Sequence, residues 1–241
     1  MSRVAQAILY FCQKYFTMWE IFKKYKIYFG TMLVVSIVTL TLFFNALTPQ
    51  KSLPIYNPSM VNPELVDTTI QYIARNHTIG DFSFLNQNGQ KITQADYDNK
   101  VYVADFFFTT CPTICIAMTD NMVRIQEALK DDKNVKLLSF SVTPEIDSVP
   151  VLKAYALEKG VIDSKWNLLT GDKKEIYTLA RKSYLVVKEG KPEELYDMVH
   201  TENFVLVDRK KRVRGFYDGT KTEDVERLIE DIKWLSTRKK N

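Results

Sequence analysis

One continuous apolar segment stands out near the start of the chain. Residues 27–47 form a run of 21 positions without a charged side chain. A helix of this length spans about 30 Å, the thickness of the hydrocarbon core of a bilayer. The run lacks the polar stripe of a core helix, and it is too long and too far from residue 1 for a cleaved signal peptide. We therefore predict a single, uncleaved transmembrane helix over residues 27–47.

Beyond residue 76, the apolar positions alternate between strand and helix spacing. The predicted strands are 81–85, 91–93, 101–108, 135–142, 166–169, 184–187, 204–208 and 213–217. The predicted helices are 112–130, 149–159, 173–182 and 222–235. The strand over 101–108 is apolar at nearly every position, as expected for a central strand covered on both faces. Strand–helix alternation followed by a hairpin and a final helix predicts an α/β domain with a mixed sheet.

The remaining segments complete the predicted organisation. Prolines recur through residues 48–76, which favours a linker. Residues 1–26 combine bulky aromatic side chains with scattered lysines. This composition suits an interfacial helix on the cytoplasmic face of a membrane. The outer domain is then predicted to cover residues 77–241.

The charged residues are distributed unevenly, and their distribution predicts an orientation. Residues 1–51 carry six basic side chains and one acidic one, whereas the remainder carries 27 basic and 28 acidic side chains. The domain is therefore nearly neutral, and nucleic-acid binding is not expected. Lys23, Lys24 and Lys26 directly precede the apolar run, which predicts a cytoplasmic N-terminus and a domain outside. The composition of residues 1–26 favours a bacterial plasma membrane, with a periplasmic or extracytoplasmic domain, over a mitochondrial presequence.

Cysteine is rare, and two of the three cysteines lie close together. Cys111 and Cys115 stand in TTCPTIC, whereas Cys12 is predicted on the other side of the membrane and is excluded from the chemistry. Pro112 suits the first turn of a helix, so Cys111 would cap that helix and Cys115 would lie one turn on. Their Cβ atoms would be roughly 5–6 Å apart. This separation allows a disulfide or a soft metal ion, and two inert buried cysteines are the structural alternative.

The residues around the two cysteines help to choose between a disulfide, a metal site and two inert cysteines. The positive end of the helix should stabilise thiolate over thiol. Three residues separate the cysteines, whereas thioredoxin-type oxidoreductases have two. The helix face of Cys115 continues through apolar side chains, a pattern more typical of helix core than of copper ligation. These side chains are Met118, Met122, Ile125 and Leu129.

Only two histidines are available as further ligands. His200 stands in DMVHTENFVLVD, a few residues before an apolar strand. His77 precedes the first strand of the domain, where a surface or capping role is the default. Taken alone, a loop histidine is more often structural than a ligand, so His200 depends on its sequence context.

Three segments together resemble the Sco/SenC family. They are YVADFFFTTCPTIC, LLSFSVTPEIDSVPVLKAYA and HTENFVLVDRKKRVRGFYDG, within a resemblance that covers about residues 77–235. The resemblance implies a thioredoxin-like fold with insertions, anchored by one transmembrane helix, that handles copper during assembly of cytochrome c oxidase. It also implies that Cys111, Cys115 and His200 bind one copper ion. Two thiolates and one imidazole suit Cu(I) and also tolerate Cu(II).

The sequence departs from the family pattern at three positions. Ile116 stands where the family often has proline, and Thr143 opens the segment that is usually DPE. We interpret both changes as neutral for metal binding. Val199 stands where an acidic residue often precedes the histidine. This change removes a potential partner of the imidazole, so it bears on affinity and redox behaviour more than on the site itself.

Two functions of different classes are consistent with these features. The first is a metallochaperone, rather than an enzyme, that passes copper to the binuclear copper site of an oxidase subunit. Its membrane anchor would raise the effective concentration of donor and acceptor. The alternative is a thiol–disulfide oxidoreductase that uses Cys111 and Cys115 as a redox-active pair to reduce the cysteines of that copper site. The partners would be the copper-site subunit, a copper donor and a thiol reductant. A peroxide-reducing enzyme is disfavoured, because we find no activating arginine near a lone cysteine.

Overall fold

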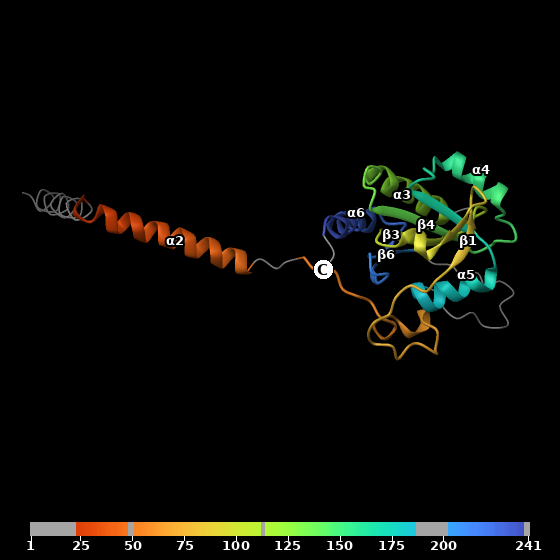
Figure 1. Cartoon of the computed structure of the whole chain (residues 1–241), viewed down its shortest axis with the longest axis horizontal. Helices are drawn as coiled ribbons and strands as arrows, with labels where there is room; N and C mark the ends of the chain where they lie inside the picture. Colours follow the sequence, from red (N-terminus) through yellow and green to blue (C-terminus); the bar gives the residue numbers. More distant parts are fainter. Residues whose placement is uncertain (1–22, 48–50, 112–113, 187–201, 239–241) are drawn as a thin grey trace, which may run out of the picture. The chain divides into compact units, whose positions relative to one another are not determined.

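The computed structural model describes residues 23–47, 51–111, 114–186 and 202–238. The chain divides into two compact units, residues 1–52 and residues 53–241 (Figure 1). The described part of the first unit is helical, and the second unit is built around a mixed β-sheet.

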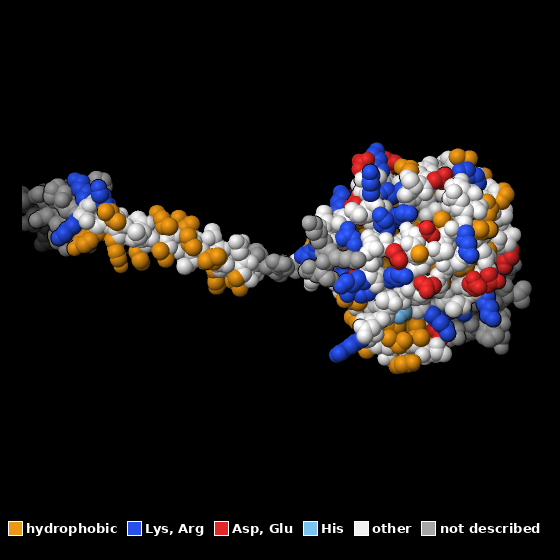
Figure 2. All heavy atoms as spheres, in the orientation of Figure 1, with side chains coloured by type: hydrophobic (Ala, Val, Ile, Leu, Met, Phe, Trp, Pro, Cys, Tyr) orange, Lys and Arg blue, Asp and Glu red, His pale blue; other side chains and the backbone are white. Residues whose placement is uncertain are grey.

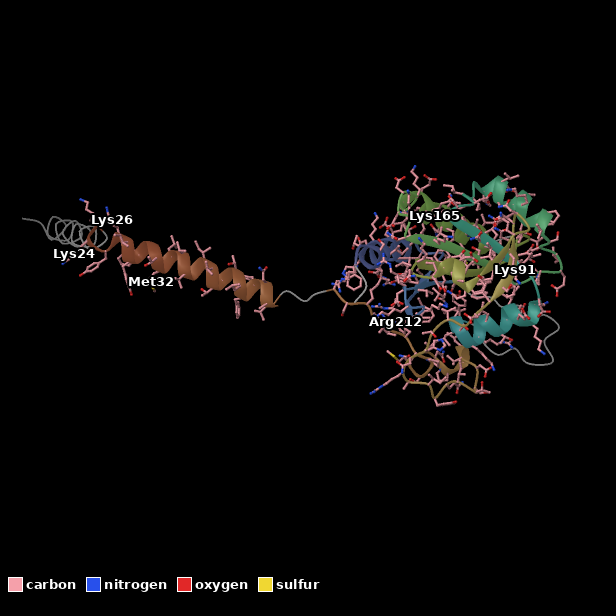
Figure 3. All side chains as sticks on the ribbon, viewed as in Figure 1. Lys24, Lys26, Met32, Lys91, Lys165 and Arg212 are labelled. Carbon is pink, nitrogen blue, oxygen red and sulfur yellow. The ribbon has the colours of Figure 1, made fainter. Side chains whose placement is uncertain are left out.

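The first unit contains α2 (Lys26–Leu47), a helix of 22 residues without a buried side chain. Apolar side chains project along it in Figure 2, and Lys24 and Lys26 lie at its N-terminal end, before Met32 (Figure 3). The hydroxyl of Thr39 donates to a carbonyl four residues earlier at 2.9 Å. A hydroxyl satisfied within the helix needs no water. The helix is long and apolar enough to cross a membrane, in agreement with the sequence prediction.

Seven strands among the described residues form one sheet, in the order β2–β1–β5–β4–β3–β6–β7. Their bounds are β1 (Ser83–Asn86), β2 (Lys91–Thr93), β3 (Val101–Phe107), β4 (Val135–Ser141), β5 (Trp166–Thr170), β6 (Asn203–Val207) and β7 (Val213–Asp218). The neighbouring strands β3, β4 and β5 run parallel, whereas β1 beside β5 and β6 beside β3 are antiparallel. The mixed α/β sheet predicted from the sequence is therefore confirmed.

Helices lie on both faces of this sheet (Figure 1). Their bounds are α3 (Ile114–Ala128), α4 (Val149–Lys159), α5 (Lys173–Leu179) and α6 (Thr222–Thr237). Gly160 ends α4 with a φ of +71°, a conformation that glycine adopts without steric cost. Both bounds of α4 agree with the prediction from the sequence.

The central strand β3 is buried along its whole length. On one face Phe106 packs against Phe140 and Tyr184, with ring centroids 5.2 and 5.5 Å away. On the other face Phe107 packs against Tyr155 of α4, with ring centroids 5.8 Å apart. Each buried aromatic side chain contributes roughly 1.5–3 kcal/mol through the hydrophobic effect. Packing on both faces therefore fixes the position and direction of β3, as its sequence predicted.

The strand predicted over residues 184–187 is wrong for the residues that the structure describes. Tyr184 ends a π-helical turn (Ala180–Tyr184), and Leu185 follows with a φ of +59°. A left-handed residue interrupts an extended chain, so no strand begins here. The side chains of Tyr184, Leu185 and Val186 are nevertheless buried. The apolar run thus reflects burial beneath the sheet rather than strand pairing.

The linker predicted over residues 48–76 is too long. From Leu53 onwards the chain belongs to the second unit. Tyr56 N–H donates to Val213 O at 2.9 Å, and the Arg214 guanidinium donates to the carbonyls of Leu53 and Pro54 at 2.6 and 2.8 Å. We call residues 53–79 the docked segment. Two of its prolines open short 3₁₀ turns, Pro58–Met60 and Pro63–Leu65.

The charged turn RKKR, residues 209–212 between β6 and β7, is held by a buried carboxylate. Arg212 donates twice to the buried carboxylate of Asp208, at 2.7 and 2.9 Å, and Arg214 donates once at 2.9 Å (Figure 3 labels Arg212). Burial alone would raise the pKa of Asp208, but the hydrogen bonds from the two arginines outweigh it and hold this pKa below its ordinary value.

We expect Asp208→Asn to destabilise a fragment of residues 51–241 by about 3 kcal/mol at pH 7, because two arginines lose their buried counter-charge. A carboxylate with a lowered pKa stabilises the fold fully above its unfolded pKa, near 3.9, and this contribution is lost as pH falls through the folded pKa. The difference from wild type should therefore be constant above about pH 5 and shrink below about pH 4. Denaturant unfolding followed by circular dichroism measures it, and an undiminished difference at pH 3 would contradict the assignment.

Candidate metal and redox site

The candidate site lies where β3 ends and α3 begins. β3 ends at Phe107, and Cys111 follows after a turn in which Cys111 N–H donates to Phe108 O at 3.4 Å. Helix α3 is described from Ile114, so Cys115 lies in its first turn. The carboxyl ends of parallel strands in α/β proteins are common positions for functional groups. Because burial fixes β3, both cysteines lie beyond the carboxyl ends of the central strands.

The structure brings Cys111 and Cys115 together as two buried thiols that are not joined in a disulfide. Only 8% of Cys111 and 6% of Cys115 is exposed. The Cys115 N–H donates to Cys111 Sγ at 3.4 Å. Cys111 therefore caps the start of α3, as the sequence predicted, and satisfies an amide that has no partner within the helix. Such a contact also stabilises negative charge on a sulfur atom.

Burial dominates the electrostatics of Cys115. It raises the pKa of this thiol to about 12, and an amide hydrogen bond from Phe108 only partly offsets the effect. The nearby Cys111 sulfur and the Asp105 carboxylate raise the pKa further, because a second negative charge is unfavourable beside them. The expectation that the helix end would favour thiolate is therefore wrong for Cys115. A cation bound at the pair would neutralise the thiolate and remove this penalty.

A buried polar group behind the pair escaped the sequence analysis. Burial raises the pKa of Asp105, on β3, to about 7, although hydrogen bonding from Ser139 lowers it. Ser139 Oγ donates to Asp105 and accepts from Trp166 Nε1 at 2.8 Å. The signal was present in VYVADFFF, where one charged residue interrupts an otherwise apolar strand. Such a residue is retained in a core only with hydrogen-bonding partners.

The face of α3 that continues from Cys115 belongs to the core. Met118 and Met122 are at most 1% exposed, and Ile125 and Leu129 are buried beside them. Thr119, on the same helix, shares a hydrogen bond of 2.8 Å with the hydroxyl of Tyr155. The core role predicted for the methionines is therefore confirmed.

The histidines differ in what the structure describes. His200, its neighbour Val199 and also Cys12 lie outside the described residues, so their predicted roles stay predictions. Within the described ranges, no group of three histidine, cysteine or acidic side chains is placed to hold a metal. His77 is buried rather than at the surface: its Nε2 donates to Ser183 O at 2.9 Å, and its N–H donates to Asn57 Oδ1 at 3.1 Å. This histidine attaches the docked segment to the domain.

Two thiols at the start of a helix that follows a central strand of a mixed sheet define a thioredoxin-like protein. The family model described as SCO1/SenC matches residues 70–237. The chain therefore belongs to the SCO1/SenC family. The SCO1 protein homolog of Bacillus subtilis (strain 168) is 35% identical over 166 residues, which are 68% of this chain and 86% of that protein.

Solved structures support the same assignment. BsSco, described as a Sco-family cytochrome c oxidase assembly protein with a disulfide switch, is 35% identical. It matches with a TM-score of 0.59 over 68% of this chain and 96% of its own. Copper-bound ScoI of Bradyrhizobium japonicum is 27% identical, with a TM-score of 0.53 over 66% of this chain and 99% of its own. The chain thus belongs to a family linked to oxidase assembly, in which copper-bound structures are known.

We expect the two thiols of a reduced, metal-free fragment of residues 51–241 to react slowly with iodoacetamide at pH 8. Both are buried, and a thiol with a pKa of about 12 is about one part in ten thousand thiolate at this pH, against roughly a quarter for an ordinary cysteine. The rate at Cys115 should rise as the pH is raised towards 11. Peptide mass spectrometry measures each cysteine separately. Alkylation of native Cys115 at the rate of the guanidinium-unfolded fragment would contradict this expectation.

Proposed function

We propose that the protein binds one copper ion through Cys111, Cys115 and His200. It then delivers the ion to the binuclear copper site of cytochrome c oxidase during assembly of the respiratory chain. The observation that carries this proposal is the pair of buried thiols, not joined in a disulfide, in which Cys115 N–H donates a hydrogen bond to Cys111 Sγ. Membership of the SCO1/SenC family supports the metal and the client.

The chemistry of the thiol pair favours a soft cation. Thiolates are preferred ligands of Cu(I), and the cost of burying a negative sulfur is offset when the metal replaces its proton. An imidazole from His200 would complete a three-coordinate site and would also accommodate Cu(II). Because the ligands are few and the two cysteines follow the carboxyl end of β3, an incoming cysteine of the oxidase subunit can replace them one at a time. Each replacement keeps the number of metal–ligand bonds constant.

A second candidate function uses the same two sulfurs for electron transfer. As a thiol–disulfide oxidoreductase, the protein would attack a disulfide at the oxidase copper site, form a mixed disulfide, and release the two client cysteines as thiols while Cys111 and Cys115 close their own disulfide. The disulfide switch described for BsSco favours this candidate. The high pKa of Cys115 disfavours it as the attacking thiol, so Cys111 would attack.

We further propose that α2 anchors the protein in a bacterial plasma membrane. Residues 1–26 would be cytoplasmic, residues 27–47 would span the membrane, and the domain would lie outside. Lys23, Lys24 and Lys26 before the helix support this orientation through the positive-inside rule. The anchor would hold the copper site close to a membrane-embedded client and to the partners that supply copper and reducing equivalents.

The copper proposal predicts a stoichiometry and a ligand set. The full chain, reduced and in detergent micelles, should bind one equivalent of Cu(I), and either Cys111→Ser or Cys115→Ser should abolish tight binding. His200→Ala should change the Cu(II) absorption spectrum, because it removes a nitrogen donor. His77→Ala is the matched control, and its spectrum should equal that of wild type. The proposal fails if the reduced protein binds no Cu(I) or if His200→Ala leaves the Cu(II) spectrum intact.

Oxidase assembly in cells separates the two candidate functions. Metal delivery predicts that His200→Ala prevents assembly while dithiol exchange by the purified variant is retained. A reductase does not need an imidazole ligand, so full assembly in the presence of His200→Ala would favour thiol reduction. Oxidase activity in membranes and the rate of glutathione-disulfide exchange by the purified protein measure the two outcomes.

The orientation predicts protease access from one side. Protease added to intact spheroplasts should degrade the domain and leave a fragment containing α2. Replacing Lys23, Lys24 and Lys26 by glutamine should reduce the proportion of molecules in this orientation, because the charge bias across the helix is lost. Protection of the domain in intact spheroplasts, with digestion only after lysis, would contradict the proposed topology.

A further inference from the structure

A buried aspartate lies beside the cysteine loop but belongs to a different part of the chain. Strands β3 and β4 are parallel, with Phe107 paired to Ser141 where both strands end. Val142 N–H continues the pairing by donating to Phe107 O at 2.9 Å. The chain leaves β3 towards Cys111 and leaves β4 towards Asp147. The two outgoing loops therefore start side by side.

The Asp147 carboxylate has no exposed surface and accepts four hydrogen bonds. Thr109 supplies two of them, from Oγ1 at 2.5 Å and from its N–H at 3.3 Å. Ser141 Oγ donates at 2.6 Å and Thr143 Oγ1 at 3.1 Å. Within the described residues, no lysine or arginine forms an ion pair with this carboxylate. Neutral donors from both loops therefore replace its hydration, and each lost donor would leave a buried acceptor unsatisfied.

The contacts of Thr109 bear on the geometry of the thiol pair. Thr109 precedes Cys111 by two residues, in a turn otherwise closed by the long hydrogen bond from Cys111 N–H to Phe108 O at 3.4 Å. The backbone and the side chain of Thr109 are both held by Asp147. A loop fixed at this point has little freedom to move Cys111 away from the start of α3. The carboxylate thus connects the end of β4 to the position of one sulfur.

We propose that Asp147 is a positioning residue that holds the Thr109 loop and thereby fixes Cys111 against Cys115 in the dithiol state. The expected effect of Asp147 on copper affinity rests on the proposed copper function. Its expected effect on the exposure of Cys111 does not, because a loosened loop exposes Cys111 whether or not the protein binds copper. Residues that orient ligands from behind typically change metal affinity 10–100-fold when they are replaced.

The test compares Asp147→Asn and Thr109→Val with a matched control in the full chain in detergent micelles. Asp208→Asn is the control, because it also replaces a buried aspartate that accepts several hydrogen bonds. Val207 pairs with Tyr102 near the start of β3, so Asp208 lies at the opposite end of the strand from Cys111. All three variants are expected to lower the stability of the fold. Only Asp147→Asn and Thr109→Val are also expected to release the loop that positions Cys111.

Two measurements are made on each variant. In the first, Cu(I) is titrated in competition with a chromogenic Cu(I) chelator. Asp147→Asn should weaken Cu(I) binding about 10–100-fold, Thr109→Val less in the same direction, and Asp208→Asn less than about twofold. In the second, iodoacetamide reacts with the reduced, metal-free protein, and Cys111 is followed by peptide mass spectrometry. Its alkylation should be faster by about tenfold in Asp147→Asn and unchanged in the control.

The outcomes separate this inference from the proposed function. If the wild type binds no Cu(I), the copper function fails, and the alkylation rates alone decide whether Asp147 positions Cys111. If Asp147→Asn does not fold by circular dichroism, Thr109→Val decides the same question, because it removes only one hydroxyl donor. Copper affinity and alkylation rates within twofold of wild type in Asp147→Asn, or in Thr109→Val where it replaces that variant, would overturn the inference.

Discussion

The burial of β3 on both faces is the constraint on which the rest of the domain depends. Its side chains pack alternately against the aromatic residues around Tyr184 and against α4, and its two edges pair with β4 and β6. A strand held in this way has one position and one direction, so the chain emerges at a fixed point of the sheet. Cys111 stands at that point, and α3 continues from it. The packing of the domain core therefore fixes the position of the thiol pair.

The environment of the thiols balances opposing effects. Burial disfavours charge on Cys115, and the buried carboxyl of Asp105 behind the pair adds to that effect. The Cys115 N–H, by contrast, donates a hydrogen bond to Cys111 Sγ and so favours negative charge on that sulfur. Such a pair is protected as thiols. A bound cation compensates the charge of the thiolates, and a disulfide leaves neither sulfur charged. This property is compatible with both metal delivery and thiol reduction, since each requires sulfurs that stay inert until a specific partner arrives.

The docked segment is held to the domain at both of its ends. Arg214 and Val213 on β7 bind its start, and the π-helical turn after α5 binds its end through His77 and Ser183. Residues 53–79 are therefore part of the domain, which begins earlier in the sequence than residue 77.

The sequence alone determined the features that depend on local signals. These are the uncharged run of α2, the apolar strand β3, the glycine that ends α4, and the cysteine that caps α3. Each of them depends on the types of residues that are adjacent in the sequence. Only the tertiary structure decided features that depend on distant neighbours. The apolar run at Tyr184 became a buried turn, the proline-bearing segment packed on β7, and Asp147 met Thr109, because burial and hydrogen-bond partners come from elsewhere in the chain. For the same reason the raised pKa of Cys115 could not be predicted: desolvation is a property of the packed environment.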